Sequence, residues 1–162
     1  MRKERRQVLA IGVLASALIF IGFYQTLFGH LCPGDGLTGG GSIVFALILA
    51  LPFSGSSFFD RENRWKLLAV AETAGALALL ALAHVDLRST LFYNALAGQG
   101  GLFGQSLPEG GNIGPFFSSG TIALINGAFA LLVIGAFGRL TTAFFEASSS
   151  GKHRREGEGE NA

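Results

Sequence analysis

The feature that most constrains this sequence is a series of long apolar segments separated by short clusters of charge. A membrane-spanning helix needs about 20 mostly apolar residues, because it rises 1.5 Å per residue through about 30 Å of hydrocarbon. Four segments meet or approach this requirement, namely residues 8–28, 42–59, 67–85 and 121–138. Lipid-facing backbone must satisfy its own hydrogen bonds, so each segment is expected to be a helix. The sequence therefore predicts an all-α integral membrane protein with four transmembrane helices.

Composition agrees with a protein of the membrane. Only 14% of the 162 residues are charged, whereas soluble domains average roughly a quarter. The length suffices for one domain, and we expect a four-helix transmembrane domain over residues 1–147. Residues 148–162 combine Ser, Gly and mixed charges, a composition typical of disorder. We therefore expect a disordered cytoplasmic tail there.

The distribution of Lys and Arg predicts the orientation. If the N-terminus is cytoplasmic, the inner segments are residues 1–7, 60–66 and 139–162, and of the 12 Lys and Arg only Arg88 falls outside them. This agrees with the excess of positive charge that cytoplasmic loops carry. The segment 42–59 is the least certain of the four spans, because it is less apolar after Phe53, where Ser and Gly residues follow. If the segment 42–59 did not cross the membrane, the positive charges of the later inner segments would no longer all lie on the cytoplasmic side. We therefore expect four spans with both termini inside.

The two outer loops differ in kind. Residues 29–41 are expected to form a short Gly-rich turn. Residues 86–119 are long for a connection, and apolar residues recur at helical spacing over residues 87–97. That pattern predicts a short interfacial helix lying on the outer surface in the second outer loop.

Glu72 is the most informative single position. It lies six residues beyond Lys66 inside the third span, which is about 9 Å along a helix. The hairpin between the second and third spans places Ser54 and Ser57 at a similar depth. One interpretation is a protonated Glu72 that hydrogen-bonds these hydroxyls and holds the helices together. The other is a proton or cation site open to the cytoplasm, because an intramembrane carboxylate is often functional.

Small residues surround Glu72 and recur in the fourth span. Ala71 and Gly75, like Ala123 and Gly127, show the four-residue spacing that lets helices approach closely. Asn126 lies within the fourth span, where an amide acts more often as a hydrogen-bonding link between helices than as a ligand. These faces suit a tightly packed bundle, self-association or assembly with other membrane subunits.

A second group of polar residues falls at the predicted outer boundary. His30 and Cys32 follow the first span, and His84 and Asp86 end the third. Imidazole, thiolate and carboxylate together could bind a transition metal. Two histidines at one depth could also hold a haem or a chlorophyll-type pigment. The simpler interpretation is that polar residues collect where helices leave the lipid, and no local metal-binding spacing favours the alternative.

Several functions are not supported by any motif. The Gly-rich stretch after Gly98 lacks the Lys-Ser/Thr pair of a phosphate-binding loop, and no Ser-based nucleophile motif occurs. The basic tail is short and mixed with Glu, so no nucleic-acid partner is expected. These features argue against an enzyme.

Three functional hypotheses remain. The first is a structural or accessory subunit of a larger membrane complex, such as a respiratory or photosynthetic one, because polar groups within the spans are few and Ala/Gly faces are abundant. The second is a small oligomeric transporter or channel in which Glu72 is the intramembrane proton or cation site. The third is a membrane redox protein that uses His30 and His84. The bacterial inner membrane is the expected location.

Overall fold

The chain forms four α-helices in a computed structural model that describes residues 2–29, 34–50, 61–84, 94–96 and 120–159. The helices are α1 (Arg2–Phe28), α2 (Gly36–Ala50), α3 (Arg61–Ala83) and α4 (Thr121–Gly159). Segments of α1, α3 and α4 are long and apolar enough to cross a membrane, over Arg5–Phe28, Glu62–Ala83 and Thr121–Ser148. The prediction of an all-α membrane protein is therefore confirmed.

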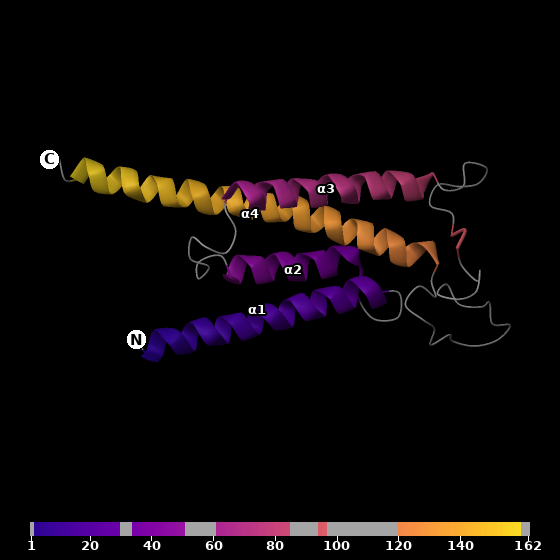
Figure 1. Cartoon of the computed structure of the whole chain (residues 1–162), viewed down its shortest axis with the longest axis horizontal. Helices are drawn as coiled ribbons and strands as arrows, with labels where there is room; N and C mark the ends of the chain where they lie inside the picture. Colours follow the sequence, from indigo (N-terminus) through magenta and orange to yellow (C-terminus); the bar gives the residue numbers. More distant parts are fainter. Residues whose placement is uncertain (1, 30–33, 51–60, 85–93, 97–119, 160–162) are drawn as a thin grey trace.

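Successive helices along the chain run in opposite directions (Figure 1). α2 packs between α1 and α4, and α3 packs on α4. The start of α1 and the end of α4 lie at the same end of the molecule (Figure 1). Four helices that alternate in direction require this arrangement. The crossing of the membrane by α2, which is shorter than the other three helices, and the side on which the termini lie stay predictions.

Glycine lies at each of the three main helix contacts. A Cβ atom at Gly22 of α1 would lie 2.6 Å from the carbonyl oxygen of Gly39 in α2. One at Gly40 of α2 would lie 2.9 Å from the carbonyl oxygen of Ala130 in α4, and one at Gly75 of α3 would lie 2.7 Å from that of Ala128. Real Cβ atoms do not approach so closely. The helices therefore pack backbone against backbone, as small residues allow in membranes.

The second helix begins earlier than predicted. α2 starts at Gly36, so half of the Gly-rich turn expected over residues 29–41 is helical, and that prediction is wrong. The reason is a reciprocal cap: the Thr38 backbone N–H donates to Asp35 Oδ1 at 2.7 Å, and the Asp35 N–H donates to Thr38 Oγ1 at 2.8 Å. This pattern satisfies free donors at a helix N-terminus. Gly39 and Gly40, which follow the cap, lie at close contacts with α1 and α4.

The described part of α2 contains 15 residues, which is about 22 Å of helix. Residues 51–59 of the predicted second span lie outside the described residues, as do Ser54 and Ser57. Gly36 of α2 lies against the backbone of Asn126 in α4, and Gly40 lies against Ala130. Both contacts advance by four residues in the same direction, so α2 and α4 run parallel.

The fourth helix is longer than its predicted span. It starts at Thr121, as predicted, but continues to Gly159, so helix extends over most of the segment 148–162 that composition predicts to be disordered. No proline interrupts this segment, and its Lys, Arg and Glu residues are good helix formers. A helix that is already nucleated extends cheaply by adding one hydrogen bond per residue.

The start of α4 is capped by a residue from the segment between α3 and α4. The backbone N–H of Thr121 donates to Asn94 Oδ1 at 2.8 Å, and Gly120 precedes it with φ of 66°, a left-handed conformation that favours glycine. Asn94 belongs to the interfacial helix predicted over residues 87–97. Most of that segment lies outside the described residues, and its described part, residues 94–96, includes a turn at 95–96.

We expect Asp35→Ala to destabilise the protein by about 1 kcal/mol, because Ala removes the cap of α2. Hydrogen bonds from the Thr38 backbone and hydroxyl lower the pKa of Asp35 below its usual value of 3.8. A lowered pKa means that the contribution of the charged cap is fully present above pH 3.8 and is lost as the pH falls through the lower, folded-state value. Detergent unfolding of wild type, Asp35→Ala and Asp35→Asn as a function of pH checks this. Asp35→Asn keeps a neutral cap and should show no such loss.

Candidate functional site at the α3–α4 contact

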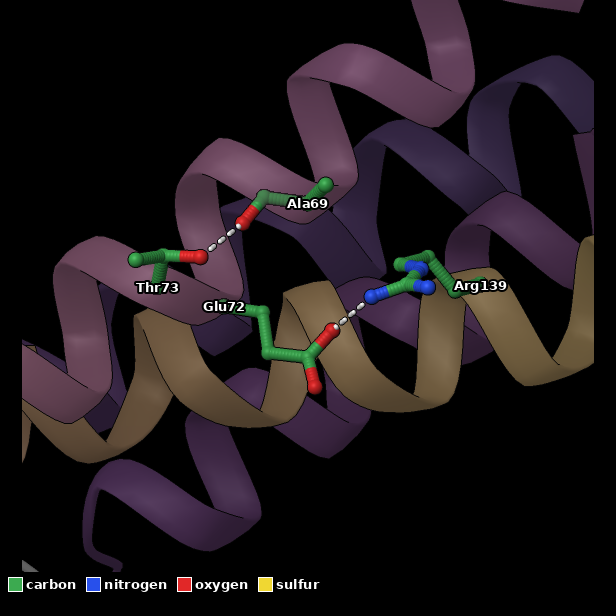
Figure 2. Close-up of polar contacts among 4 residues, drawn as sticks. All are labelled: Ala69, Glu72, Thr73 and Arg139. Atoms are coloured by element: carbon green, nitrogen blue, oxygen red, sulfur yellow. Dashed lines mark hydrogen bonds and ion pairs between the residues drawn. The ribbon is translucent and has the colours of Figure 1, made fainter.

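Glu72 lies at the middle of α3 and pairs with Arg139 of α4. Arg139 Nη1 donates to Glu72 Oε2 at 2.6 Å, and Figure 2 shows the two side chains directed toward each other across the two helices. A charge-assisted hydrogen bond of this length is among the stronger polar contacts in proteins. The carboxylate within the span is therefore matched by a cation from the same chain.

The antiparallel arrangement of α3 and α4 brings these two side chains together. Gly135 lies directly opposite Glu72, since a Cβ atom there would lie 2.6 Å from the Glu72 Cα. Arg139 is one helical turn further along α4. Side chains of a helix lean toward its N-terminus, so Glu72 leans toward the start of α3 and Arg139 leans back toward the start of α4. The two therefore meet halfway between their backbone levels.

A second polar contact between α3 and α4, from Trp65 to Glu146, lies two helical turns from the ion pair. Trp65 precedes Glu72 by seven residues and Glu146 follows Arg139 by seven, which places each on the same face of its helix. The Trp65 indole N–H donates to Glu146 Oε1 at 3.4 Å, a long hydrogen bond. The Arg139 guanidinium carbon lies 5.4 Å from the centre of the Trp65 ring, within the range of a cation–π contact. Two carboxylates, one guanidinium and one indole thus line a single side of the α3–α4 contact.

The ion pair is only half covered by the chain itself. The Glu72 side chain is 35% exposed and that of Arg139 is 39% exposed. By contrast, Thr73 beside it is exposed but donates its hydroxyl hydrogen to the Ala69 carbonyl at 2.8 Å, within its own helix (Figure 2). A hydroxyl satisfied in this way tolerates lipid, whereas a charged pair facing hydrocarbon is costly.

The sequence also predicted Ser54, Ser57 and Asn126 as intramembrane polar residues of the site. Ser54 and Ser57, the predicted partners of Glu72, lie outside the described residues. Asn126 lies at the α2–α4 contact, where its backbone carbonyl faces Gly36. The role of its side-chain amide as a link between helices stays a prediction.

Of the four predicted boundary ligands, His30, Cys32 and Asp86 lie outside the described residues. His84 is exposed, and its Nδ1 lies 2.7 Å from the Leu80 carbonyl oxygen, where the protonated nitrogen can satisfy one of the last carbonyls of α3. Within the described part of the chain, no group of three or more His, Cys, Asp and Glu could hold a metal ion. The predicted metal, haem or pigment site stays untested.

Sequence reasoning missed Arg139 as the partner of Glu72. Its positive charge placed Arg139 in a predicted cytoplasmic segment. The expected partners of Glu72 were therefore the serines of the hairpin between the second and third spans. The signal was the matched seven-residue spacing from Trp65 to Glu72 and from Arg139 to Glu146. In two antiparallel helices, that spacing brings both pairs into register.

Comparison with known protein families gives a match over most of the chain. Residues 8–139 match a family described as a domain related to the MnhB subunit of a Na⁺/H⁺ antiporter. This range covers more than three quarters of the 162 residues. The chain belongs to this family. A comparison with curated proteins gives no match.

The MnhB-related region ends at Arg139, so it contains the α1 and α2 packing, all of α3 and both members of the Glu72–Arg139 pair. The remainder of α4, with Glu146, lies beyond it. Membership in a family named for a subunit supports the predicted class, a subunit of a membrane protein complex with other membrane subunits as partners. The three long apolar helices agree with a multi-pass protein, and the bacterial plasma membrane is the location that these findings support.

Proposed function

We propose that this chain is an accessory subunit of a multi-subunit Na⁺/H⁺ antiporter, and that it supports assembly and does not itself carry the ion. The observation that carries the proposal is the match to the MnhB-related family over residues 8–139. Arg139 supports the accessory role, because its 2.6 Å contact with Glu72 occupies the carboxylate that a transported cation would need.

The packing also favours an accessory role. Among the described residues, the buried apolar side chains are mostly alanines at helix contacts: Ala15, Ala46, Ala123, Ala128 and Ala130, with Ile43, Val44 and Val133. Helices that approach this closely leave little room for a water-filled path between them. A path across the membrane is therefore better placed in other subunits or between subunits.

The alternative is that Glu72 binds a proton or cation during transport, with Arg139 as a counter-charge that is displaced. The half-exposed carboxylate favours this idea, since a cation could reach it without unfolding the helix contact. Liposomes containing the purified chain alone would then show Na⁺ or proton flux that Glu72→Gln abolishes. Under the accessory role, the chain alone gives no flux above that of empty liposomes.

Purification from native membranes in mild detergent tests the proposed function. We expect a tagged chain to elute in a complex much larger than its own 17.0 kDa, with other antiporter subunits identified by mass spectrometry. Recovery of the chain alone and monomeric would contradict the proposal. A second measurement is Na⁺/H⁺ exchange in everted membrane vesicles, which deletion of the chain should abolish and its return should restore.

A further inference from the structure

The half-exposed ion pair has one covered side and one open side. On the covered side, the neighbours of Glu72 on its helix are Leu68 and Gly75, which pack against α4. The corresponding neighbours of Arg139 are Gly135, which packs against α3, and Thr142, which is buried. These four positions form the interior of the α3–α4 contact.

The open side is bordered by alanines. Residues three before and four after a given residue lie beside it on a helix surface. For Glu72 these positions on the open side are Ala69 and Ala76, and for Arg139 they are Ala136 and Ala143. All four alanines are only half-buried. We call Ala69, Ala76, Ala136 and Ala143, together with the ion pair that they flank, the alanine face.

The alanine face is poorly suited to lipid. Glu72 lies about 9 Å inside the apolar part of α3, where a charged side chain exposed to hydrocarbon is costly. The pair offers hydrogen-bonding atoms on its exposed side, since 35% and 39% of the two side chains remain uncovered. The short alanine side chains would let a neighbouring backbone approach the pair closely. Both properties call for a protein neighbour.

We infer that the alanine face is the surface on which a transmembrane helix of a different subunit packs, and that this helix places an uncharged hydrogen-bonding side chain against the Glu72–Arg139 pair. The partner group is uncharged because the carboxylate and the guanidinium already cancel each other at 2.6 Å. Its helix carries small residues at the contact, because flat alanine surfaces favour close crossings. This inference rests on the proposed membership of an antiporter complex.

Photo-crosslinking from two positions of α3 tests the inference. Ala76 lies on the alanine face, while Ala74 is exposed on another side of the same helix and provides a matched control. A benzophenone side chain is introduced at either position in the full chain, and the intact complex is illuminated in native membranes. We expect Ala76 to give a covalent adduct with another subunit and Ala74 to give at least severalfold less of it.

The other outcomes overturn the inference. An adduct at Ala76 with phospholipid alone would show that lipid covers the face, and an adduct at twice the mass of the chain would show a second copy there. Equal adducts from Ala74 and Ala76 would show that the pair does not mark the contact. If the wild-type chain proves to be in no complex, the proposed function fails instead, and purification detects that separately.

Leucine substitutions give a second test that does not depend on crosslinking. Ala76→Leu should lower the recovery of other subunits with the tagged chain by about tenfold, because overpacking of a close contact weakens it. Ala74→Leu adds the same bulk elsewhere on the helix and should leave recovery unchanged. Equal recovery from both variants, with both chains inserted at wild-type levels, would contradict the inference.

Discussion

Arg139→Gln is expected to destabilise the isolated chain by about 2–3 kcal/mol, because it leaves the Glu72 carboxylate unpaired within the membrane. Glu72→Gln should destabilise less, since the long Arg139 side chain can turn toward the nearer membrane surface and regain water. The double variant, with Gln at both positions, should recover to within about 1 kcal/mol of wild type, because two amides can hydrogen-bond each other without a buried charge. Unfolding by sodium dodecyl sulfate, followed by circular dichroism in mild detergent, measures all three.

The double variant decides whether the two residues act as a pair. If the two single effects simply add, the 2.6 Å contact contributes little to stability and Glu72 and Arg139 act independently. Lys66→Gln provides a matched control, because Lys66 pairs with Glu62 on an exposed part of the same helix at 2.7 Å. An exposed pair of this kind contributes about 0–1 kcal/mol, so this variant should be nearly neutral.

Gly135→Ala is expected to destabilise the chain by about 1–3 kcal/mol. The added Cβ would lie 2.6 Å from both the Cα and the Cβ of Glu72, so α3 and α4 would have to separate. That separation would also lengthen the contact between Glu72 and Arg139. The same unfolding measurement checks the loss of stability.

Gly127→Ala is the matched control on the same helix. A Cβ at Gly127 meets nothing within 4 Å among the described residues, and Ala is a better helix former than Gly by up to about 1 kcal/mol. The two variants make the same chemical change, but we expect Gly135→Ala to lower the stability of the protein and Gly127→Ala to raise it. A neutral or stabilising Gly135→Ala would show that α3 and α4 do not pack backbone against backbone.

The sequence predicted the long helices well because hydropathy and length are local properties. Residues 8–28 lie within α1, and residues 67–83 of the predicted span 67–85 lie within α3. Thr121 is the first residue of α4. The start of α2 was missed because composition alone makes a run of glycines resemble a turn. Its helical state depends on the Asp35–Thr38 cap and on close neighbours in α1 and α4.

The candidate site was predicted in part. Glu72 stood out because a carboxylate within an apolar span is rare. Its partner could not be chosen from hydropathy, since that choice depends on which helices are neighbours in space. Contact between α3 and α4 made Arg139 the partner, while the interaction predicted with Ser54 and Ser57 lies outside the described residues.

The most direct test of the accessory role is Na⁺/H⁺ exchange in everted vesicles whose complex contains the chain with both Glu72→Gln and Arg139→Gln. This variant removes the only carboxylate within the apolar part of α3 and, by the argument above, keeps the helix contact intact. If the chain supports assembly and does not carry the ion, exchange continues at close to the wild-type rate once the complex is shown to assemble. Loss of exchange in a fully assembled complex would contradict the account and would assign ion coupling to Glu72.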